Sequence, residues 1–368
     1  ALDERVQAVE HFSATGELDP NANIQFGEGG AGTFSDGKLT TRIGDELCGF
    51  VTEVFLQHGA PAEIAWKQKP HVGTDLLRGV ITSIRKEIES LGGEVHFNTA
   101  LTGFEQKNGR LTGIFTTGGT FPCEALVFAV GHSARDTFGM LMDSGLVLEC
   151  KPFSVGFRAE HLQSEIEKSL YHEAAGHPAL PRGEYQLSQH VGDRCVYTFC
   201  MCPGGFVIPA ATDKEQIVVN GMSPSNRGTQ WSNSGMVVET LPEDVGGESD
   251  DPLRVMHFQE QLERSCWQQG NMKQTAPAQR MADFVNNRLS YDLPKSSYAP
   301  GLISSPLHFW LPSFVGKRLQ EGFRKFGKMS HGFLTNEAVL IATETRTSSP
   351  VRILRDRETL QHVALRGL

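Results

Sequence analysis

Two cysteines separated by one residue form the pair with the clearest chemical potential in this sequence. Cys200 and Cys202 stand in "FCMCPGG", inside an alternating run that is typical of a β-strand. Side chains two residues apart in a strand share a face, so we expect the two thiols to be neighbours. Such a pair can pass electrons through a disulfide. The alternative is a packed strand leading into the turn after Pro203 and lining a cavity. No second Cys or His pair follows at ligand spacing, so no metal site is predicted.

A glycine-rich segment, "NIQFGEGGAGTFSDGKL" (23–39), is the second such feature. Its glycines allow backbone amides to converge on an anionic or polar group, and polar side chains stand beside them. The alternative is a tight structural connection that holds no ligand. The candidates for ligand contact are Gly29, Gly30, Gly32, Thr33, Ser35 and Lys38.

Two further polar motifs, "AVGHSARDT" and "ETRTSSPVRI", each contain a weak catalytic candidate. His132 titrates near neutral pH and can carry a proton, although a histidine after a strand is more often structural. Arg346 can stabilise negative charge or orient a carboxylate. No pair stands out as acid and base, so the catalytic residues stay undetermined at this point. Arg135 could pair with a phosphate or an acidic substrate, or form a surface pair with Asp136. The polar residues of one strand pattern could line a domain interface or form a solvated strand face: Arg158, Glu160 and His161. A polar loop that could bind an anionic substrate contains Arg227 and Asn233.

Composition limits the function classes. The chain has 368 residues, 39% hydrophobic and 21% charged, which suffices for two or three domains. A net charge of −9 argues against a nucleic-acid-binding surface. No apolar run approaches membrane-span length, and no signal peptide is visible. Seven cysteines without framework spacing favour a cytoplasmic location. Both ends look like cuts through a longer protein, and a small-molecule substrate is expected.

The elements that must position these residues follow from periodicity. Helices are predicted over 45–58 and 74–91, the second with apolar residues at helical spacing and Gly92-Gly93 after it. A strand at 94–98 and a meander turning at Asn108-Gly109 come next. The unbroken apolar run 125–130 predicts a buried parallel strand that ends at Gly131.

The pattern of predicted elements changes near Lys151. Strands are predicted at 153–161, on both sides of the turn at 203–205, and at 216–222. Helical patterns start at Pro252, Pro277 and Leu311. The acidic stretch 241–251 is predicted to be a surface connection. Residues 337–356 predict a strand, a polar loop and another strand.

The order of helix, strand, meander and buried strand ending in Gly matches the second half of a glutathione-reductase-type FAD-binding domain. Together with "NIQFGEGGAGTFSDGKL", "FAVGHSARDT", "FCMCPGGFVIPA" and "ETRTSSPVRILRD", it resembles the uncharacterised FAD-dependent dehydrogenase family of bacteria and plastids. These proteins are two-dinucleotide-binding-domain flavoproteins. The resemblance covers essentially all of the chain. It implies a G-x-G-x-x-G unit upstream of residue 1, and the lack of that unit here predicts weakened retention of FAD.

The resemblance also implies roles for single residues. The glycine-rich loop would face the ribityl chain and flavin edge, and the segment 95–101 would lie beside the adenine. Gly131 would approach the cofactor where a side chain would collide, and the loop at 345–348 would reach the flavin ring. The further cofactor-binding residues on this basis are Thr99, Leu101, Gly131 and Thr347.

The predicted fold is therefore α/β with an α+β insert: a partial Rossmann-like FAD-binding domain (1–150 and 334–368) into which a mixed β and helical substrate domain (151–333) is inserted. The predicted function is an FAD-dependent oxidoreductase or dehydrogenase of unknown substrate, with NAD(P)H as a possible electron donor. The alternatives are a non-enzymatic flavin-binding or partner-docking protein, and flavin-linked disulfide chemistry through Cys200 and Cys202.

Overall fold

The computed structural model describes residues 2–41 and 43–368. The chain divides into two compact units, each assembled from three separate segments. Unit 1 comprises residues 1–93, 154–239 and 262–345, and unit 2 comprises 94–153, 240–261 and 346–368. Each unit therefore depends on contacts between segments that are far apart in the sequence.

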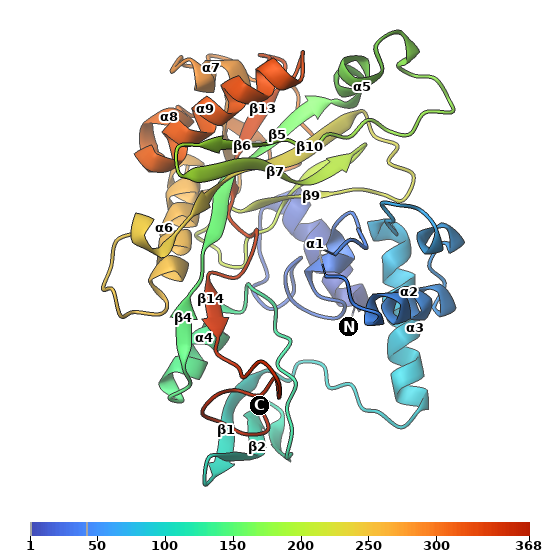
Figure 1. The fold of residues 1–368 in the computed structure, drawn as a ribbon, viewed down its shortest axis with the longest axis vertical. Coiled ribbons are helices and arrows are strands. Elements are labelled where there is room, and N and C mark those ends of the chain that lie inside the picture. Colours follow the sequence, from blue (N-terminus) through green and yellow to red (C-terminus); the bar gives the residue numbers. More distant parts are fainter. Residues whose placement is uncertain (1, 42) are drawn as a thin grey trace. The chain divides into compact units, whose positions relative to one another are not determined.

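Unit 1 is built on a seven-stranded, mostly antiparallel sheet with strand order β12-β11-β13-β5-β10-β7-β6 (Figure 1). Among the pairs of this sheet whose register is described, β11–β12 is parallel, and β11–β13, β13–β5, β10–β7 and β6–β7 are antiparallel. The central strand β13 is buried at every position, so its apolar run "VLIAT" needs no alternation. The strands are β5 (Phe153–Leu162), β6 (Ser188–Val191), β7 (Arg194–Pro203), β10 (Trp231–Thr240), β11 (Ala276–Arg280), β12 (Leu302–Ser304) and β13 (Val339–Glu344).

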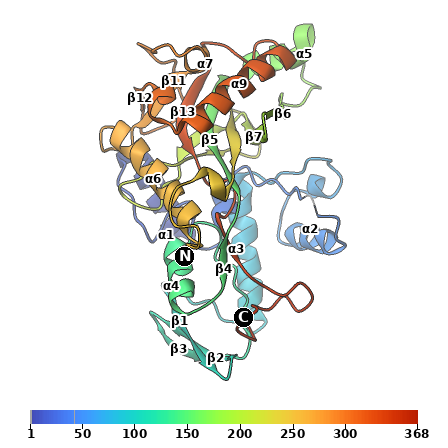
Figure 2. The same cartoon turned by 60° about the vertical axis from the view of Figure 1, so that its left-hand side comes forward.

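Helix α9 (Ser313–Met329) covers β6 and β7 with one apolar face (Figure 2). Val315, Leu319, Phe323 and Phe326 recur at helical spacing and are fully buried, which confirms the predicted amphipathic helix. The other helices of this region are α5 (Gln163–Tyr171), η3 (His172–Ala174), α7 (Met281–Val285) and α8 (Leu307–Trp310). Helix α6 (Arg254–Gln269) begins in a chain segment of unit 2 and ends in a segment of unit 1.

The N-terminal part of unit 1 carries α1 (Leu2–Thr15), η1 (Ala31–Phe34), α2 (Leu47–Gln57), η2 (Ala62–Ala65) and α3 (Thr74–Ser90). The helices predicted at 45–58 and 74–91 are confirmed. A hairpin of β8 (Phe206–Pro209) and β9 (Val219–Met222) adds Ile208 and Val218 to the small core around Phe34. The predicted strand pair around the Gly204-Gly205 turn is confirmed by β7 and β8.

Unit 2 contains the predicted meander, β1 (Leu101–Lys107), β2 (Arg110–Thr116) and β3 (Gly119–Pro122). Asn108 and Gly109 both have positive φ, 54° and 71°, as a two-residue hairpin turn requires. A second core includes Leu141 and Val351 and joins α4 (Arg135–Asp143) to the β4–β14 pair. The remaining elements are β4 (Leu148–Cys150), η4 (Pro242–Asp244) and β14 (Val351–Ile353).

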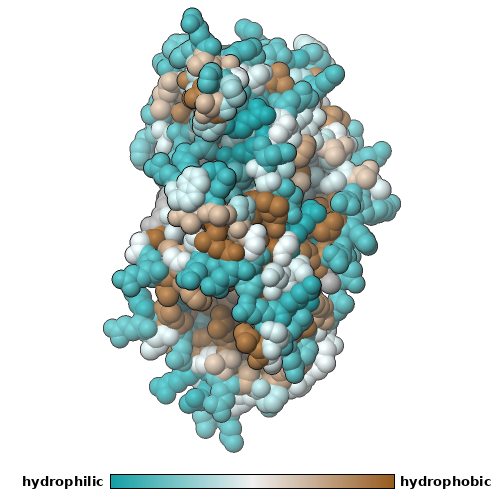
Figure 3. Space-filling model, turned by 90° about the vertical axis from the view of Figure 1, so that its right-hand side faces the viewer, coloured by the Kyte–Doolittle hydropathy of each residue, from teal (hydrophilic) through white to brown (hydrophobic). Residues whose placement is uncertain are grey.

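Three strand and helix predictions were wrong. Neither 94–98 nor 125–130 forms a strand, since no described strand pairs with either segment. The run 125–130 is also not buried, and Val127 is 90% exposed. Apolar side chains reach the surface in several places on the face drawn in Figure 3. The helix expected from Pro277 begins only at Met281, because 276–280 pair with β13 as β11.

The fold is thus mixed α/β with a mostly antiparallel main sheet. The glutathione-reductase-type arrangement and the division into a cofactor domain and an insert stay predictions. No helix among the described residues is long and apolar enough to cross a membrane.

Candidate active site in unit 1

A buried arginine holds the glycine-rich loop in place. Arg5 of α1 donates hydrogen bonds to three carbonyl oxygens of the loop region, those of Asn23 (2.7 Å), Ile24 (2.8 Å) and Glu28 (2.7 Å). Its guanidinium also lies 4.7 Å from the ring centre of Phe34. Burial lowers the pKa of Arg5 to about 10, so the side chain stays charged at neutral pH. The loop conformation is therefore fixed by side-chain contacts in place of regular secondary structure.

Two of the predicted glycines have positive φ, 81° at Gly29 and 62° at Gly30. A Cβ at Gly29 would collide with the Thr33 hydroxyl, whereas a Cβ at Gly30 or Gly32 would meet nothing within 4 Å. The loop therefore turns tightly at Gly29 and leaves its backbone open at Gly30 and Gly32.

The polar side chains of the loop differ in what they contact. Thr33 is fully buried, and its hydroxyl has no hydrogen-bond partner among the described residues. Its carbonyl oxygen accepts a 2.8 Å hydrogen bond from Thr74 at the start of α3. Ser35 is used locally, donating to the Gly32 carbonyl (3.0 Å) and accepting from the Gly37 amide (3.2 Å). Thr33 is thus the better ligand candidate.

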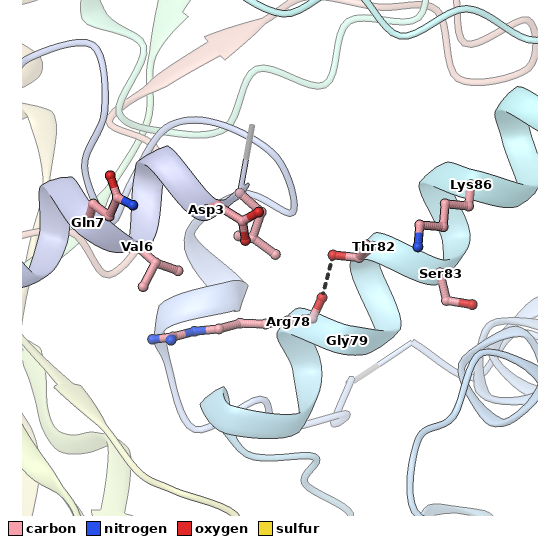
Figure 4. Close-up of a pocket in the computed structure, with 9 residues that line it drawn as sticks. Asp3, Val6, Gln7, Arg78, Gly79, Thr82, Ser83 and Lys86 are labelled. Atoms are coloured by element: carbon pink, nitrogen blue, oxygen red, sulfur yellow. Dashed lines mark hydrogen bonds between the residues drawn. The ribbon is translucent and has the colours of Figure 1, made fainter.

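A cavity of about 680 Å³ lies between α1 and α3. Asp3, Val6 and Gln7 project from α1 on one side, and α3 lines the other side (Figure 4). Arg78 of α3 also lies over Phe34, 5.0 Å from the ring centre. Arg5 and Arg78 thus both contact the aromatic ring of η1, so α1, α3 and the loop pack around the side chain of Phe34.

Lys38, at the end of the loop, reaches the main sheet. Its ammonium group donates to the carbonyl oxygen of Met201 on β7, 163 residues away, and lies 3.4 Å from Asp36 Oδ2. Arg227 pairs with the same carboxylate at 2.9 Å. Burial disfavours the Lys38 charge, but the nearby Cys202, Cys200 and Asp36 outweigh it and raise the pKa of Lys38. The glycine-rich loop and the Cys-x-Cys motif therefore meet in one site.

Strand β7 is interrupted where the cysteines stand. Its register with β10 shifts between the pairs Phe199–Gly235 and Cys202–Asn233, so one extra residue is inserted in β7. Cys200 has a φ of 45°, which is uncommon outside glycine. A bulge of this kind bends the strand and redirects side chains, and bulges are common beside active sites.

The two thiols contact each other, as the alternation predicts, but they have different properties. A hydrogen bond from Cys202 and the charges of Lys38 and Arg158 lower the pKa of Cys200 to about 5, against the effect of burial. The same hydrogen bond and burial raise the pKa of Cys202 well above its usual value. Cys200 is partly exposed and Cys202 is fully buried. At neutral pH the pair is one thiolate and one thiol.

A buried ion pair contacts the Cys200–Cys202 cluster through Arg158. Arg158 on β5 is fully buried and lies 3.0 Å, Nε to Oε2, from Glu344 on β13. It donates to the Cys200 carbonyl and to Asn220 Oδ1, both at 2.7 Å. Burial raises the pKa of Glu344 to about 7, and Arg158 opposes that shift. Arg158 was a weak candidate in the sequence, and Glu344 was not predicted. The signal for Glu344 was a carboxylate at the end of the apolar run "VLIATE", where a buried charge needs a partner.

Asn233, one of the weaker predicted residues, lies directly opposite Cys202 across the β7–β10 pair. Its side chain is fully buried, and neither amide atom has a hydrogen-bond partner among the described residues. A Cβ at Gly221 would press on Asn233 Oδ1, Cys202 Sγ and Arg158 Cζ, so β9 approaches the cluster by its bare backbone. The site thus contains unsatisfied polar groups of the kind that ligands or ordered water fill.

The other predicted cofactor-binding and catalytic residues belong to unit 2. Thr99 is half-buried and donates to the Phe97 carbonyl, and Leu101 begins β1. Gly131 has a φ of 79° and lines a cavity of about 930 Å³. His132 shares a 2.9 Å hydrogen bond with Ser133, Arg346 is buried and Thr347 is half-buried. Their predicted cofactor roles stay predictions.

The remaining weak candidates have structural contacts. Arg135 donates to Gln259 at 2.6 Å within unit 2, while His161 is fully buried and contacts the Phe333 carbonyl. Glu160 is buried and accepts hydrogen bonds from Ser297. None of the three belongs to the cluster around Cys200.

Residues 152–347, more than half of the chain, match the model of a family described as "FAD-dependent protein, C-terminal domain-like". The chain belongs to this family. FAD is accordingly the cofactor. A protein of Clostridium beijerinckii, described only as uncharacterized, is 44% identical over 371 residues and aligns with 100% of this chain and 69% of its own length. The dehydrogenase subfamily expected from the sequence goes beyond this finding.

Solved flavoprotein structures show only a distant likeness. CtdE in complex with FAD is 13% identical with a TM-score of 0.23, covering 46% of this chain and 37% of that one. The tetracycline destructase Tet(51) is 11% identical with a TM-score of 0.25, covering 61% and 53% of the two chains. Likeness at this level carries no argument about fold or function, and the match spans about half or less of the solved chains.

The residues of unit 1 fit a polar cofactor with anionic groups. The loop backbone is open at Gly30 and Gly32, and the Thr33 hydroxyl beside it is buried without a partner. Arg78 and Lys38 supply positive charge on either side of the loop. These residues would hold part of the FAD.

Proposed function

We propose that this family member is a flavin-dependent oxidoreductase, a dehydrogenase that acts on a small molecule in unit 1. Bound FAD supplies the acceptor for a hydride or an electron pair. The chain itself would supply binding, charge and proton handling.

One observation carries this proposal: Lys38 ties the glycine-rich loop to the β7 bulge. The loop that fits the cofactor and the buried cluster of ionisable groups are thereby neighbours within unit 1. Clusters of ionisable residues with strongly shifted pKa values are enriched at active sites. Thr33 of the loop and Asn233 of β10 both have buried polar atoms without a hydrogen-bond partner among the described residues, as groups that face a ligand do.

The named residues have separate roles in the proposal. Lys38 and Arg158 place positive charge where negative charge develops on reduction. Glu344, with a pKa of about 7, holds or releases a proton near neutral pH. Arg5 orients the loop through the carbonyls of Asn23, Ile24 and Glu28 and is a positioning residue.

The test is anaerobic reduction of the flavin-loaded protein, followed by the visible absorbance of oxidised flavin. NADH, NADPH and a panel of alcohols, amines and acids serve as donors. We expect one class of donor to bleach the flavin, and Lys38→Met to slow bleaching by about tenfold through loss of one favourable charge. Lys67→Met is the matched control, because Lys67 is exposed and its described side-chain contacts are the ion pair with Glu63 and the ring of Trp66.

The competing hypothesis is a flavin-binding protein without catalysis. It predicts that no donor bleaches the flavin while chemical reduction by dithionite still does. That outcome, with Lys38→Met indistinguishable from Lys67→Met, would overturn the proposal.

A further inference from the structure

The Cys200–Cys202 pair has features that flavin reduction alone does not use. The two cysteines stand at the bulge of β7. The positive φ of Cys200 brings its thiol against that of Cys202. A bulge that only bent the strand would not require two cysteines.

Charged groups from three other elements face the Cys200 sulfur. Lys38 and Asp36 come from the loop before α2, Arg158 from β5 and Glu344 from β13. The hydrogen bond from Cys202 and the two cations favour the thiolate, whereas Asp36 opposes it, and the net effect lowers the pKa of Cys200. The thiolate is the nucleophilic form of cysteine.

Access differs between the two sulfurs. Cys200 is partly exposed, while Cys202 is fully buried directly behind it. An accessible thiolate next to a buried thiol is the arrangement of an attacking and a resolving cysteine. Because Cys200 is only partly exposed, a small reaction partner is favoured over the surface disulfide of a folded protein.

We propose that Cys200 and Cys202 form a thiol–disulfide exchange site for low-molecular-weight disulfides. The Cys200 thiolate attacks one sulfur of the disulfide RSSR, forms a Cys200–SR bond and releases RS⁻. The Cys202 thiol then loses its proton and attacks the Cys200 sulfur, releasing the second RS⁻ and closing the Cys200–Cys202 disulfide. Two protein thiols are oxidised, and one disulfide is reduced to two thiols. The exchange does not depend on the flavin chemistry proposed above.

The experiment treats the full chain with bis(2-hydroxyethyl) disulfide, stops the reaction with acid, and measures the mass of each cysteine peptide. In the unchanged protein we expect an internal Cys200–Cys202 disulfide and little retained adduct. In Cys202→Ser the mixed disulfide should accumulate at Cys200, because no second thiol is present to resolve it. In Cys200→Ser, Cys202 should stay unmodified because it is buried.

Cys195 provides a matched control on the same strand, since it is partly exposed and has a different environment beside Ser188. The lowered pKa of Cys200 keeps its thiolate populated in mildly acidic solution, so Cys200 should react faster than Cys195 at acidic pH. This advantage should shrink as the pH rises, because a thiolate with a low pKa is intrinsically the weaker nucleophile. Cys195→Ser should leave disulfide closure unchanged.

Absence of a Cys200 adduct in Cys202→Ser, or modification of Cys195 faster than that of Cys200 at acidic pH, would overturn the proposal. A stable Cys200 adduct in the unchanged protein would refute the resolving role of Cys202. Circular dichroism melting checks each variant, and Cys202→Ala, which buries no hydroxyl, replaces Cys202→Ser if the latter does not fold. The masses of thiol peptides do not report flavin reduction, so this proposal and the flavin function can fail separately.

Discussion

The buried Arg158–Glu344 pair leads to an asymmetric prediction, because only one partner can become neutral. Both side chains are almost completely buried. In Glu344→Gln the guanidinium keeps its charge without a counterion, and breaking a buried pair in this way costs about 3–5 kcal/mol. In Arg158→Met the carboxyl group can bind a proton, since burial already raises its pKa to about 7 with Arg158 opposing that shift.

The Arg158→Met variant still loses stability by another route. Its two hydrogen bonds to the Cys200 carbonyl and Asn220 disappear, and hydrogen bonds from a charged donor contribute about 1.5–3 kcal/mol each. We therefore expect losses of similar size from both variants at neutral pH. Their pH dependence should distinguish them.

The sign follows from the protons bound by each state. A carboxyl with a raised folded pKa binds a proton in the folded state and not in the unfolded state, so stability falls as pH rises between the unfolded and folded pKa values. That window ends at about 7 in the unchanged protein. Without Arg158 it extends to higher pH, which adds a loss of about 1.4 kcal/mol for each further pH unit. Glu344→Gln abolishes this slope.

Urea unfolding followed by circular dichroism from pH ~6 to ~8 measures the slopes. Both variants are built on Cys200→Ser, because the depressed pKa of Cys200 produces a slope of opposite sign in the same range. Equal slopes for Arg158→Met and Glu344→Gln would refute the conclusion that Glu344 titrates with a raised pKa.

Three stability predictions concern single positions, each measured as the free energy of unfolding. Arg5→Met should cost about 2–4 kcal/mol, because three carbonyls lose a charged donor. A loss of stability no larger than that caused by substituting an exposed Arg would contradict the role of Arg5 in holding the loop. Gly29→Ala should destabilise by more than about 1 kcal/mol, since its Cβ would strike Thr33 at a φ of 81°, and no loss would show that the loop can relax. In helix α9, Gly316→Ala should stabilise the protein by up to about 1 kcal/mol, because the new Cβ meets nothing within 4 Å. Gly322→Ala should destabilise it, because the new Cβ would lie 2.5 Å from Val196. Stability changes of the same sign for both variants would refute this packing.

Local sequence patterns predicted most elements that are stable by their own periodicity or turn chemistry. The amphipathic spacing of α9 and the Asn108-Gly109 turn are encoded by neighbouring residues, and both were found where predicted. The run 125–130 failed because apolar composition specifies burial only when another segment supplies a partner strand. In unit 2 the described backbone contact of this run is from Leu126 to the Gly367 carbonyl.

The sequence by itself determined that Cys200, Cys202, Lys38 and the glycines were chemically capable residues. Only the tertiary structure decided that they act on one another. The contact from Lys38 to Met201 spans 163 residues, and the Arg158–Glu344 pair joins strands β5 and β13 from distant parts of the chain. No local pattern encodes a bulge that turns Cys200, or the loss of water that shifts the pKa values of the thiols and of Glu344. Those properties depend on which charges fold together in a water-poor interior, where electrostatic interactions between them are strong.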